Sequence, residues 1–238
     1  MKKVPSFLAV IPARGGSKRL LGKNIIDFMG KPLIAWTIGA ALESRYITEV
    51  IVSTDDKDIA DVSREFGAKV PYLRPKYLGG DRISVVDVLI DYLQSLDKLP
   101  EYVIVLQPTS PLRSSFYIDD AIDKMGKNDA SVSVTKVNKP SAWSNSLPKD
   151  GSLDKFLDKS LHNQQSQEFE NFFALNGAIY ICRTDRLLIE KTLLLSSKAV
   201  AYKMPYTASI DIDDEIDLLV AKGIYLGVPK AIQKLGEK

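Results

Sequence analysis

The first segment that could do chemistry is a cationic, glycine-containing loop at residues 11–24. It follows directly on the apolar residues 6–11, which are predicted to form a short buried strand. Glycine lets backbone N–H groups turn toward an anion, and cationic side chains add the countercharge. The pair Gly15 and Gly16 is surrounded by Arg14, Lys18, Arg19 and Lys23. The loop is predicted to bind a polyphosphate; the alternative is a solvated basic turn.

The spacing of this loop does not match the P-loop of kinases and GTPases. That motif needs four residues between its glycines, and a Ser or Thr that binds Mg²⁺. Here Gly16 and Gly22 enclose residues 17–21, which is one residue too many, and Asn24 stands where the Ser or Thr would be. A kinase or GTPase is therefore disfavoured.

A second candidate site lies near the C-terminus, where Asp211 and Asp213 alternate with isoleucines in the sequence SIDIDDE. On a strand these two carboxylates lie on the same face, and they repel each other unless a cation lies between them. Such oxygen ligands suit Mg²⁺, which takes one or two carboxylates and leaves its other positions to water and phosphate. The alternative is that Asp213, Asp214 and Glu215 form an acidic first helical turn. That alternative does not account for Asp211, which precedes the expected helix.

Arg74 and Ser84 stand at the two ends of a loop, LRPKYLGGDRIS, that follows an expected strand. In a doubly wound sheet, ligand groups lie at the carboxyl ends of the strands and in the loops beyond them, so both residues are candidates for a binding site. The alternative for Ser84 is that it only caps the next helix.

The segment QPTSPLR begins with Gln107, directly after the apolar strand expected at residues 102–106. Its two prolines stiffen the turn and so position Gln107 and Arg113 at little entropic cost. The alternative is a tight turn in which Ser110 caps a helix that starts at Pro111.

Composition limits the class of protein. The chain has 238 residues, of which 45% are hydrophobic, enough for one α/β domain with an insertion. The formal net charge is only +2, so the cationic loop is a local concentration, and neither a nucleic acid nor a membrane is expected as a partner. Cys182 is the single cysteine, which excludes an intrachain disulfide, and no run is long enough for a signal peptide or a membrane span. A cytoplasmic location is expected.

Strand and helix patterns alternate along the chain in the manner of repeated βα units, which predicts a doubly wound α/β fold. The expected strands are residues 6–11, 49–54, 69–73, 102–106, 130–137, 176–183 and 199–204, with a short acidic strand at 209–213. The expected helices are residues 32–44, 55–67, 84–96 and 116–125, with a last helix that follows the acidic strand. The pattern fails at residues 138–176, which are rich in proline, polar and aromatic residues and are interpreted as an insertion that folds against the active site or another subunit.

Taken together, these segments resemble the acylneuraminate cytidylyltransferases, the enzymes that make CMP-sialic acid and related CMP-nonulosonic acids. IPARGGSKRLLGKN, IVSTDD, LRP with GGD, QPTSPLR, NGAIYI and SIDIDDEIDL occur in the order found in that family. The resemblance implies a doubly wound, mostly parallel (mixed) Rossmann-like sheet of the nucleotide-diphospho-sugar transferase type. The nucleotidyltransferase domain would comprise residues 1–137 and 177–238, and the insertion at 138–176 would build a homodimer. The implied reaction transfers CMP from CTP to the anomeric hydroxyl of a nonulosonic acid and releases pyrophosphate.

The resemblance also implies roles for particular residues. The triphosphate would be held by Arg14, Gly15, Ser17, Lys18 and Lys23. The ribose and cytosine would be bound by Asn24, Arg74 and Ser84. The acceptor sugar would meet Gln107, Asn176 and Tyr180, and Mg²⁺ would be bound by Asp211 and Asp213. In this scheme the catalytic groups are Arg14, Lys18, Lys23 and the two aspartates, and charge stabilisation is the main source of rate.

The chain departs from the family pattern on the acceptor side. Trp143 and Ser166 stand where a lysine and an arginine are usual, and an aromatic pair is replaced by Leu193 and Leu194. An aliphatic wall suits a deoxygenated, methyl-ended sugar such as legionaminic acid, so a 5,7-diamino-type acid is expected to serve at least as well as N-acetylneuraminic acid.

Two gaps remain in this assignment. Lys136 and Lys139 are the candidates to supply the positive charge that the usual lysine and arginine would place near the acceptor acid. His162, the single histidine, lies in the insertion, so no general base is assigned.

Two other classes remain as alternatives. One is a Kdo or methylerythritol phosphate cytidylyltransferase, against which NGAIYI and SIDID argue. The other is a non-enzymatic nucleotide-binding protein, for which loss of Lys23, Asp211 or Asp213 would be expected; all three are present.

Overall fold

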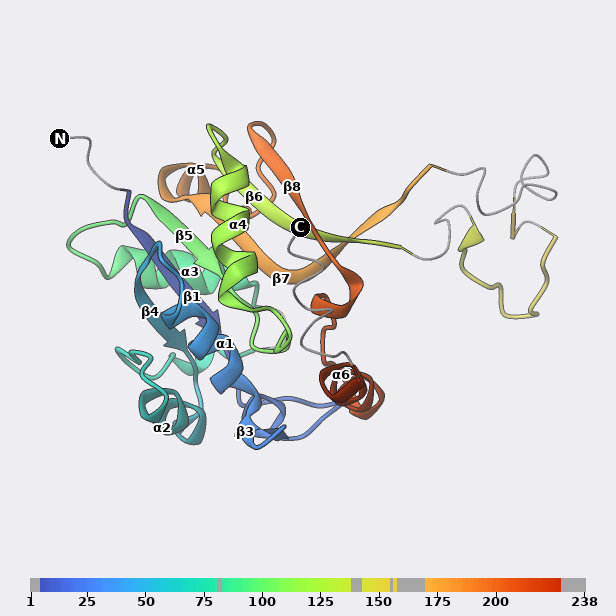
Figure 1. Ribbon diagram of the computed structural model, residues 1–238, viewed down its shortest axis with the longest axis horizontal. Helices are drawn as coiled ribbons and strands as arrows, with labels where there is room; N and C mark the ends of the chain where they lie inside the picture. The colour runs from blue at the N-terminus through green and yellow to red at the C-terminus, as the bar shows by residue number, and fades with distance from the viewer. Residues whose placement is uncertain (1–4, 81–82, 138–142, 155, 158–169, 228–238) are drawn as a thin grey trace.

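The computed structural model describes residues 5–80, 83–137, 143–154, 156–157 and 170–227. Its centre is a six-stranded sheet in the order β4-β1-β5-β7-β6-β8 (Figure 1). The strands are β1 (Phe7–Pro12), β4 (Ile47–Ser53), β5 (Tyr102–Val105), β6 (Ala130–Lys136), β7 (Phe173–Arg183) and β8 (Ala199–Met204). A separate small hairpin pairs β2 (Asp27–Phe28) with β3 (Lys31–Pro32).

The sheet is mixed. Strand β1 runs parallel to both of its neighbours, β4 and β5, and β6 runs parallel to β8. Strand β7 is antiparallel to β5 on one side and to β6 on the other. The mixed α/β sheet expected from the sequence is confirmed, and its antiparallel member is the strand that follows the insertion.

Helices cover both faces of the sheet, as a doubly wound fold requires. They are α1 (Leu33–Leu42), α2 (Lys57–Glu65), α3 (Val85–Gln94), α4 (Ser115–Met125), α5 (Thr184–Glu190) and α6 (Glu215–Gly227). Side chains alternate along β1: Phe7, Ala9 and Ile11 pack with α1, α2 and α4, whereas Leu8 and Val10 pack with α3 and α5. This period of two is the pattern of a strand buried on both faces.

A third apolar cluster joins α6 to the β2–β3 hairpin through Phe28, Leu33 and Leu218. Trp36 on α1 packs edge-on against Phe28 and Tyr225, and its indole N–H donates to the carbonyl oxygen of Phe28 at 2.8 Å. The cluster thereby holds the segment before α6 close to the cationic loop.

Three expectations about elements are wrong. Residues 69–73 form no strand: Lys69 makes one isolated bridge to Ile51, and Pro71 lacks the N–H that a longer ladder needs. Residues 209–213 are irregular. Ser110 caps no helix, because α4 begins at Ser115.

The boundary of the insertion also differs. Strand β7 begins at Phe173, and residues 173–175 pair with β6, so the end of the expected insertion belongs to the central sheet. Among the described residues, no helix is long and apolar enough to cross a membrane.

Candidate active site

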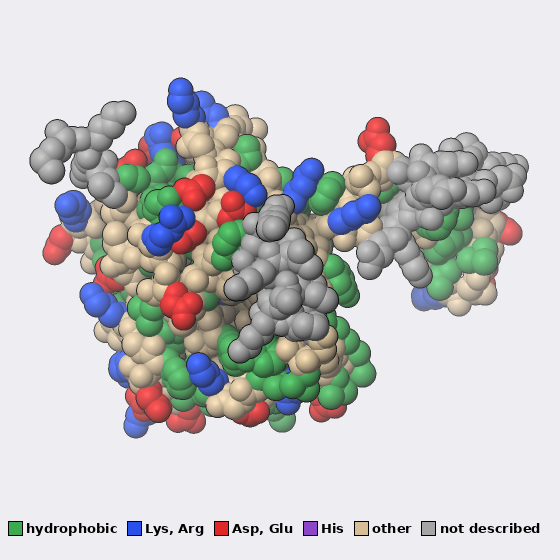
Figure 2. All heavy atoms as spheres, viewed as in Figure 1, with side chains coloured by type: hydrophobic (Ala, Val, Ile, Leu, Met, Phe, Trp, Pro, Cys, Tyr) green, Lys and Arg blue, Asp and Glu red, His purple; other side chains and the backbone are tan. Residues whose placement is uncertain are grey.

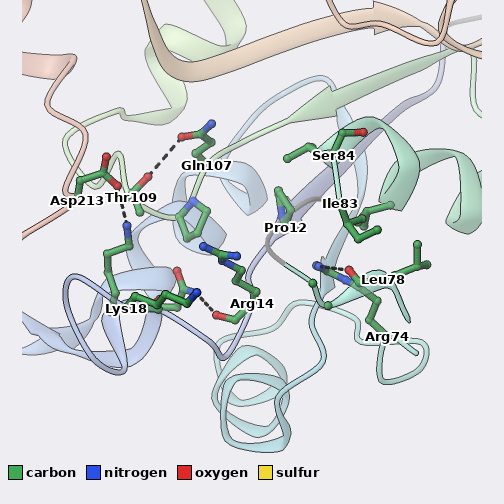
Figure 3. A pocket seen from close by; sticks show the side chains of 18 of the residues that line it. Pro12, Arg14, Lys18, Arg74, Leu78, Ile83, Ser84, Gln107, Thr109 and Asp213 are labelled. Carbon is green, nitrogen blue, oxygen red and sulfur yellow. Dashed lines mark hydrogen bonds and ion pairs between the residues drawn. The ribbon is translucent and has the colours of Figure 1, made fainter. Parts of the chain in front are cut away.

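A pocket of about 510 Å³ opens at the carboxyl ends of β1 and β5 (Figure 3). The cationic loop, the loop that leads to α3, the turn after β5 and the segment before α6 all contribute to it. The predicted site residues that line it are Arg14, Ser17, Lys18, Lys23, Asn24, Arg74, Ser84, Gln107 and Asp213. Segments far apart in the sequence thus meet where a doubly wound sheet binds its ligands.

The cationic loop is held in shape by two hydrogen bonds. The backbone N–H of Gly15 donates to Oδ1 of Asp55 at 3.0 Å, and the Nδ2 of Asn24 donates to the carbonyl oxygen of Arg14 at 2.9 Å. A Cβ at Gly15 would lie 2.5 Å from Oδ2 of Asp56, so a larger residue does not fit there. Gly15 does not line the pocket; it lets the loop approach the end of β4 closely.

Asp213 lies between two cations of the loop. Its Oδ1 is 2.9 Å from Nζ of Lys23, and its Oδ2 is 2.7 Å from Nη2 of Arg19. Burial alone would raise the pKa of Asp213, but the hydrogen bonds and charges of Lys23 and Arg19 outweigh it and hold the pKa below its ordinary value. Arg19 belongs to the predicted loop, but no role was predicted for it; its pairing with Asp213 spans 194 positions of sequence, which no local pattern reveals.

Asp211 lies behind Asp213 and does not line the described pocket. The backbone N–H of Ile212 donates to the carbonyl oxygen of Thr109 at 2.8 Å and ties this segment to the turn after β5. Burial raises the pKa of Asp211; a hydrogen bond from Thr109 opposes the rise, and the charge of Asp213 adds to it. The buried Oδ1 of Asp211 has no hydrogen-bond partner among the described residues.

This donor set fits a magnesium ion. An unpartnered carboxylate oxygen and a second carboxylate stand beside a cationic loop suited to phosphate, and Mg²⁺ takes one or two carboxylates together with phosphate oxygens and water. Among the described residues, no group of three or more acidic, histidine or cysteine side chains is arranged to hold a metal ion.

Arg74 lines the pocket, but its guanidinium donates hydrogen bonds to other groups of the protein. Its Nε donates to Oγ of Ser53, its Nη2 to the carbonyl oxygen of Ser53 at 2.5 Å, and its Nη1 to that of Leu78. Burial lowers the pKa of Arg74, and the charge of Asp55 opposes that shift. The side chain therefore joins the end of β4 to the loop before α3 and offers the pocket one face of its guanidinium plane.

Ser84 caps α3 and lines the pocket as well. Its Oγ accepts the N–H of Asp87 at 3.1 Å and donates to Oδ2 of Asp87 at 2.7 Å, which completes a capping box. Ser84 therefore caps the helix but does not only cap it, and its role in nucleotide binding stays a prediction.

The three residues predicted for the acceptor sugar separate in the structure. Gln107 lines the pocket. Asn176 is buried outside it: its amide accepts from Ser133 at 2.5 Å and donates to Ser209 at 2.8 Å, which binds β6, β7 and the segment after β8 together. Tyr180 is half-buried on β7; burial raises its pKa, and the charge of Asp211 adds to this rise.

The residues that depart from the family pattern are only partly described. Leu193 is buried in the core cluster against which Tyr180 packs, and Leu194 is exposed; neither lines the pocket. The aliphatic wall expected for the acceptor is not among the residues that line the described pocket, and it stays a prediction. Ser166, Lys139 and His162 lie outside the described residues.

The sheet order and the pocket at its carboxyl edge define a nucleotide-diphospho-sugar transferase fold. A structure of CMP-2-keto-3-deoxy-manno-octonic acid synthetase complexed with CTP superposes with a TM-score of 0.69 at 20% identity, over 93% of this chain and 99% of that one. The 4-diphosphocytidyl-2C-methyl-D-erythritol synthase of Anaerococcus prevotii gives 0.65 at 16% identity, over 94% and 100%. At these identities the likeness shows the fold alone.

Sequence comparison gives the family. The family model for cytidylyltransferases matches residues 8–202, and the chain belongs to that family. The matched range ends before Asp211 and Asp213.

Comparison with curated relatives shows which cytidylyltransferases the chain is similar to. The chain is 41% identical to the CMP-N,N'-diacetyllegionaminic acid synthase of Legionella pneumophila, over 89% of this chain and 92% of the relative. It is 34% identical to the pseudaminic acid cytidylyltransferase of Campylobacter jejuni, over 92% and 95%. It is 37% identical to the N-acylneuraminate cytidylyltransferase of Escherichia coli, over 90% of this chain but 51% of that longer protein. The predicted resemblance to this group of cytidylyltransferases is confirmed.

Proposed function

We propose that the protein transfers CMP from CTP to the anomeric hydroxyl of a nonulosonic acid and releases pyrophosphate. The observation that carries this proposal is the similarity, over about nine-tenths of both chains, to relatives named for making CMP-legionaminic acid and for cytidylyl transfer to pseudaminic acid. The pocket is consistent with it, because the cationic loop lines it together with Asp213, whose carboxylate pairs there with Lys23.

In this proposal the cationic loop binds the triphosphate. Arg14, Lys18 and Lys23 would surround the β- and γ-phosphates, and the hydroxyl of Ser17 would add a hydrogen-bond donor. Gly15, whose N–H is bonded to Asp55, would act by shaping the loop. As the bond to the leaving pyrophosphate breaks, negative charge grows on its oxygens, and fixed cations stabilise that charge. Asn24, Arg74 and Ser84 lie on the remaining walls, where the ribose and cytosine would be held.

Asp211 and Asp213 would hold a divalent cation, which supplies charge neutralisation at the attacked phosphate when bound. Before binding, Asp213 is paired with Lys23 and Arg19. A bound triphosphate would compete for these two cations, which would leave the carboxylate of Asp213 available to the cation. The Oδ1 of Asp211 has no hydrogen-bond partner among the described residues, so it would bind the cation without first giving up an ion pair.

The acceptor would bind between Gln107 and Tyr180, next to the two aspartates. Both side chains can donate hydrogen bonds to the oxygens of an acidic sugar. The similarity to the legionaminic acid enzyme supports a 5,7-diamino acceptor.

We further propose a homodimer. The ends of β6 and β7 extend away from the body as an arm, and apolar side chains gather near its outer end (Figures 1 and 2). Leu147 and Leu153, from residues 143–154, and Leu175 on β7 are each more than half exposed, and exposed apolar side chains of this kind suit a protein interface. Light scattering should give twice the mass of the chain. The cytoplasmic location expected from the sequence stays a prediction.

The function is tested by pyrophosphate release with Mg²⁺ and a panel of nonulosonic acids plus Kdo. CTP should react much faster than ATP or GTP, and at least one nonulosonic acid should be accepted. Equal rates with all nucleotides, or no release with any acid, would refute the proposal. Turnover confined to Kdo would support the alternative CMP-Kdo synthetase.

A further inference from the structure

Arg113, in the turn between β5 and α4, is buried and has no ion-pair partner among the described residues. The side chain is only 1% exposed. Its Nη2 donates to Oγ1 of Thr37 at 2.8 Å and to the carbonyl oxygen of Gln107 at 3.4 Å, while Nε and Nη1 have no partner in the described structure. Burial lowers the pKa of Arg113 to about 9. Burying a charge without a counterion is unfavourable, so the position calls for a functional explanation.

The group that Arg113 and Thr37 share is the carbonyl oxygen of Gln107. Thr37, on α1, donates its hydroxyl to that oxygen at 3.2 Å and accepts from Arg113 in return. Two donors from separate elements thus fix the backbone at the carboxyl end of β5. Neither Arg113 nor Thr37 lines the pocket, whereas Gln107 does.

The side chain of Gln107 is fixed as well. Its Oε1 lies 3.5 Å from Oγ1 of Thr109, a hydroxyl whose single proton it shares with Asp211 (Figure 3). It also lies so close to β7 that a Cβ at Gly177 would come within 2.9 Å of it. With Oε1 directed toward Thr109 and Gly177, the two N–H donors of the amide remain for a ligand.

We propose that Arg113 and Thr37 are positioning residues for the acceptor: they hold Gln107 so that its amide N–H groups donate to an oxygen of the acidic sugar. This inference rests on the proposed function. Its physical basis is that a preorganised donor binds an oxygen without first losing conformational freedom, whereas a mobile glutamine must be ordered at each binding event. In the proposed arrangement CTP would lie along the walls that Arg14, Arg74 and Ser84 line, so its binding should not depend on this anchor.

The decisive variant is Thr37→Val, which keeps the volume of the side chain and removes its hydroxyl. We expect KM for the acceptor acid to rise about tenfold, the effect of one lost hydrogen bond, and KM for CTP to stay within about twofold. Thr37→Ser, which restores the hydroxyl, should bring KM back. Arg113→Lys should act in the same direction; if that variant does not fold, Thr37→Val carries the test.

A double-mutant cycle separates positioning from general damage. In a Gln107→Ala background, Thr37→Val should not raise KM for the acceptor further, because the group that it positions is absent. Three outcomes with an active wild type would overturn the inference. Thr37→Val could leave KM for the acceptor unchanged, or it could raise KM for the acceptor and KM for CTP equally. It could also raise KM for the acceptor additively in the Gln107→Ala background. A wild type that is inactive with every acid would refute the proposed function instead, and this inference with it.

Discussion

Replacing either aspartate of the proposed metal site by asparagine should abolish most activity but affect stability differently at the two positions. Asp213 is paired with Lys23 and Arg19 at 2.9 and 2.7 Å, and its side chain is 38% exposed. Solvent screens such a pair, so Asp213→Asn should lower the free energy of unfolding by less than about 1 kcal/mol. Asp211 is half-buried, its buried Oδ1 has no hydrogen-bond partner among the described residues, and its pKa is raised, so the folded state disfavours its charge. Asp211→Asn removes that charge and should leave the metal-free protein as stable as the wild type or more so.

The effect on turnover should be large for both variants. If the two carboxylates hold a metal that neutralises charge at the reacting phosphate, losing one carboxylate should reduce kcat by on the order of a hundredfold or more. That factor corresponds to about 2.7 kcal/mol of lost transition-state stabilisation. Asp213→Asn also frees Lys23 and Arg19 from their ion pairs, which should keep the affinity for triphosphate or increase it.

The assay is pyrophosphate release at saturating CTP and acceptor over a range of Mg²⁺ concentrations, with urea unfolding in the absence of metal. Direct Mn²⁺ binding gives a readout independent of turnover. Asp214→Asn is the matched control, because Asp214 caps α6 through the N–H groups of Ile216 and Asp217 and asparagine can accept the same bonds. It should keep near-normal kcat. Near-normal turnover in Asp211→Asn and Asp213→Asn would refute the metal site.

Three further outcomes are expected. Gly15→Ala should raise KM for CTP at least tenfold, because the added Cβ would lie 2.5 Å from Oδ2 of Asp56. Gly16→Ala is the control and should leave KM for CTP unchanged, because no atom lies within 4 Å of its added Cβ. Equal effects of the two variants would contradict the role of the close approach of Gly15 to Asp56. Asn176→Ala should lower the free energy of unfolding by about 1–3 kcal/mol in a urea titration, because it removes buried hydrogen bonds with Ser133 and Ser209 and the acceptor of the buried N–H of Ala178; unchanged stability would contradict this. Under equal CTP and Mg²⁺, kcat/KM for a 5,7-diamino nonulosonic acid should equal or exceed that for N-acetylneuraminic acid, and a clear preference for the latter would refute the acceptor assignment.

The sequence by itself determined the sheet and the position of the site. Apolar runs with turn residues between them predicted β1, β4, β5, β6 and β8, because the alternation of buried side chains is a local property of the chain. The cationic loop needed no tertiary information either, since glycines and basic side chains within one short stretch already specify an anion site.

Tertiary contacts decided whether a segment forms a strand where the local sequence pattern was ambiguous. Residues 69–73 look like a strand, but only Lys69 pairs with a neighbour. The segment around Asp211 and Asp213 has the alternation of a strand but lacks a partner strand; it is held by one backbone bond to Thr109. A strand needs a partner for its ladder, and which partners are available depends on the whole sheet.

The working arrangement of the pocket was likewise decided only by the fold. No local signal shows that Arg19 meets Asp213, that the guanidinium of Arg74 is used by Ser53 and Leu78, or that Arg113 is buried against Thr37. These contacts join residues on different elements, and their strength depends on burial and on the neighbouring charges. Residue types and spacing therefore determined which chemistry this chain can do, and the packing of distant segments decided which side chains remain available for it.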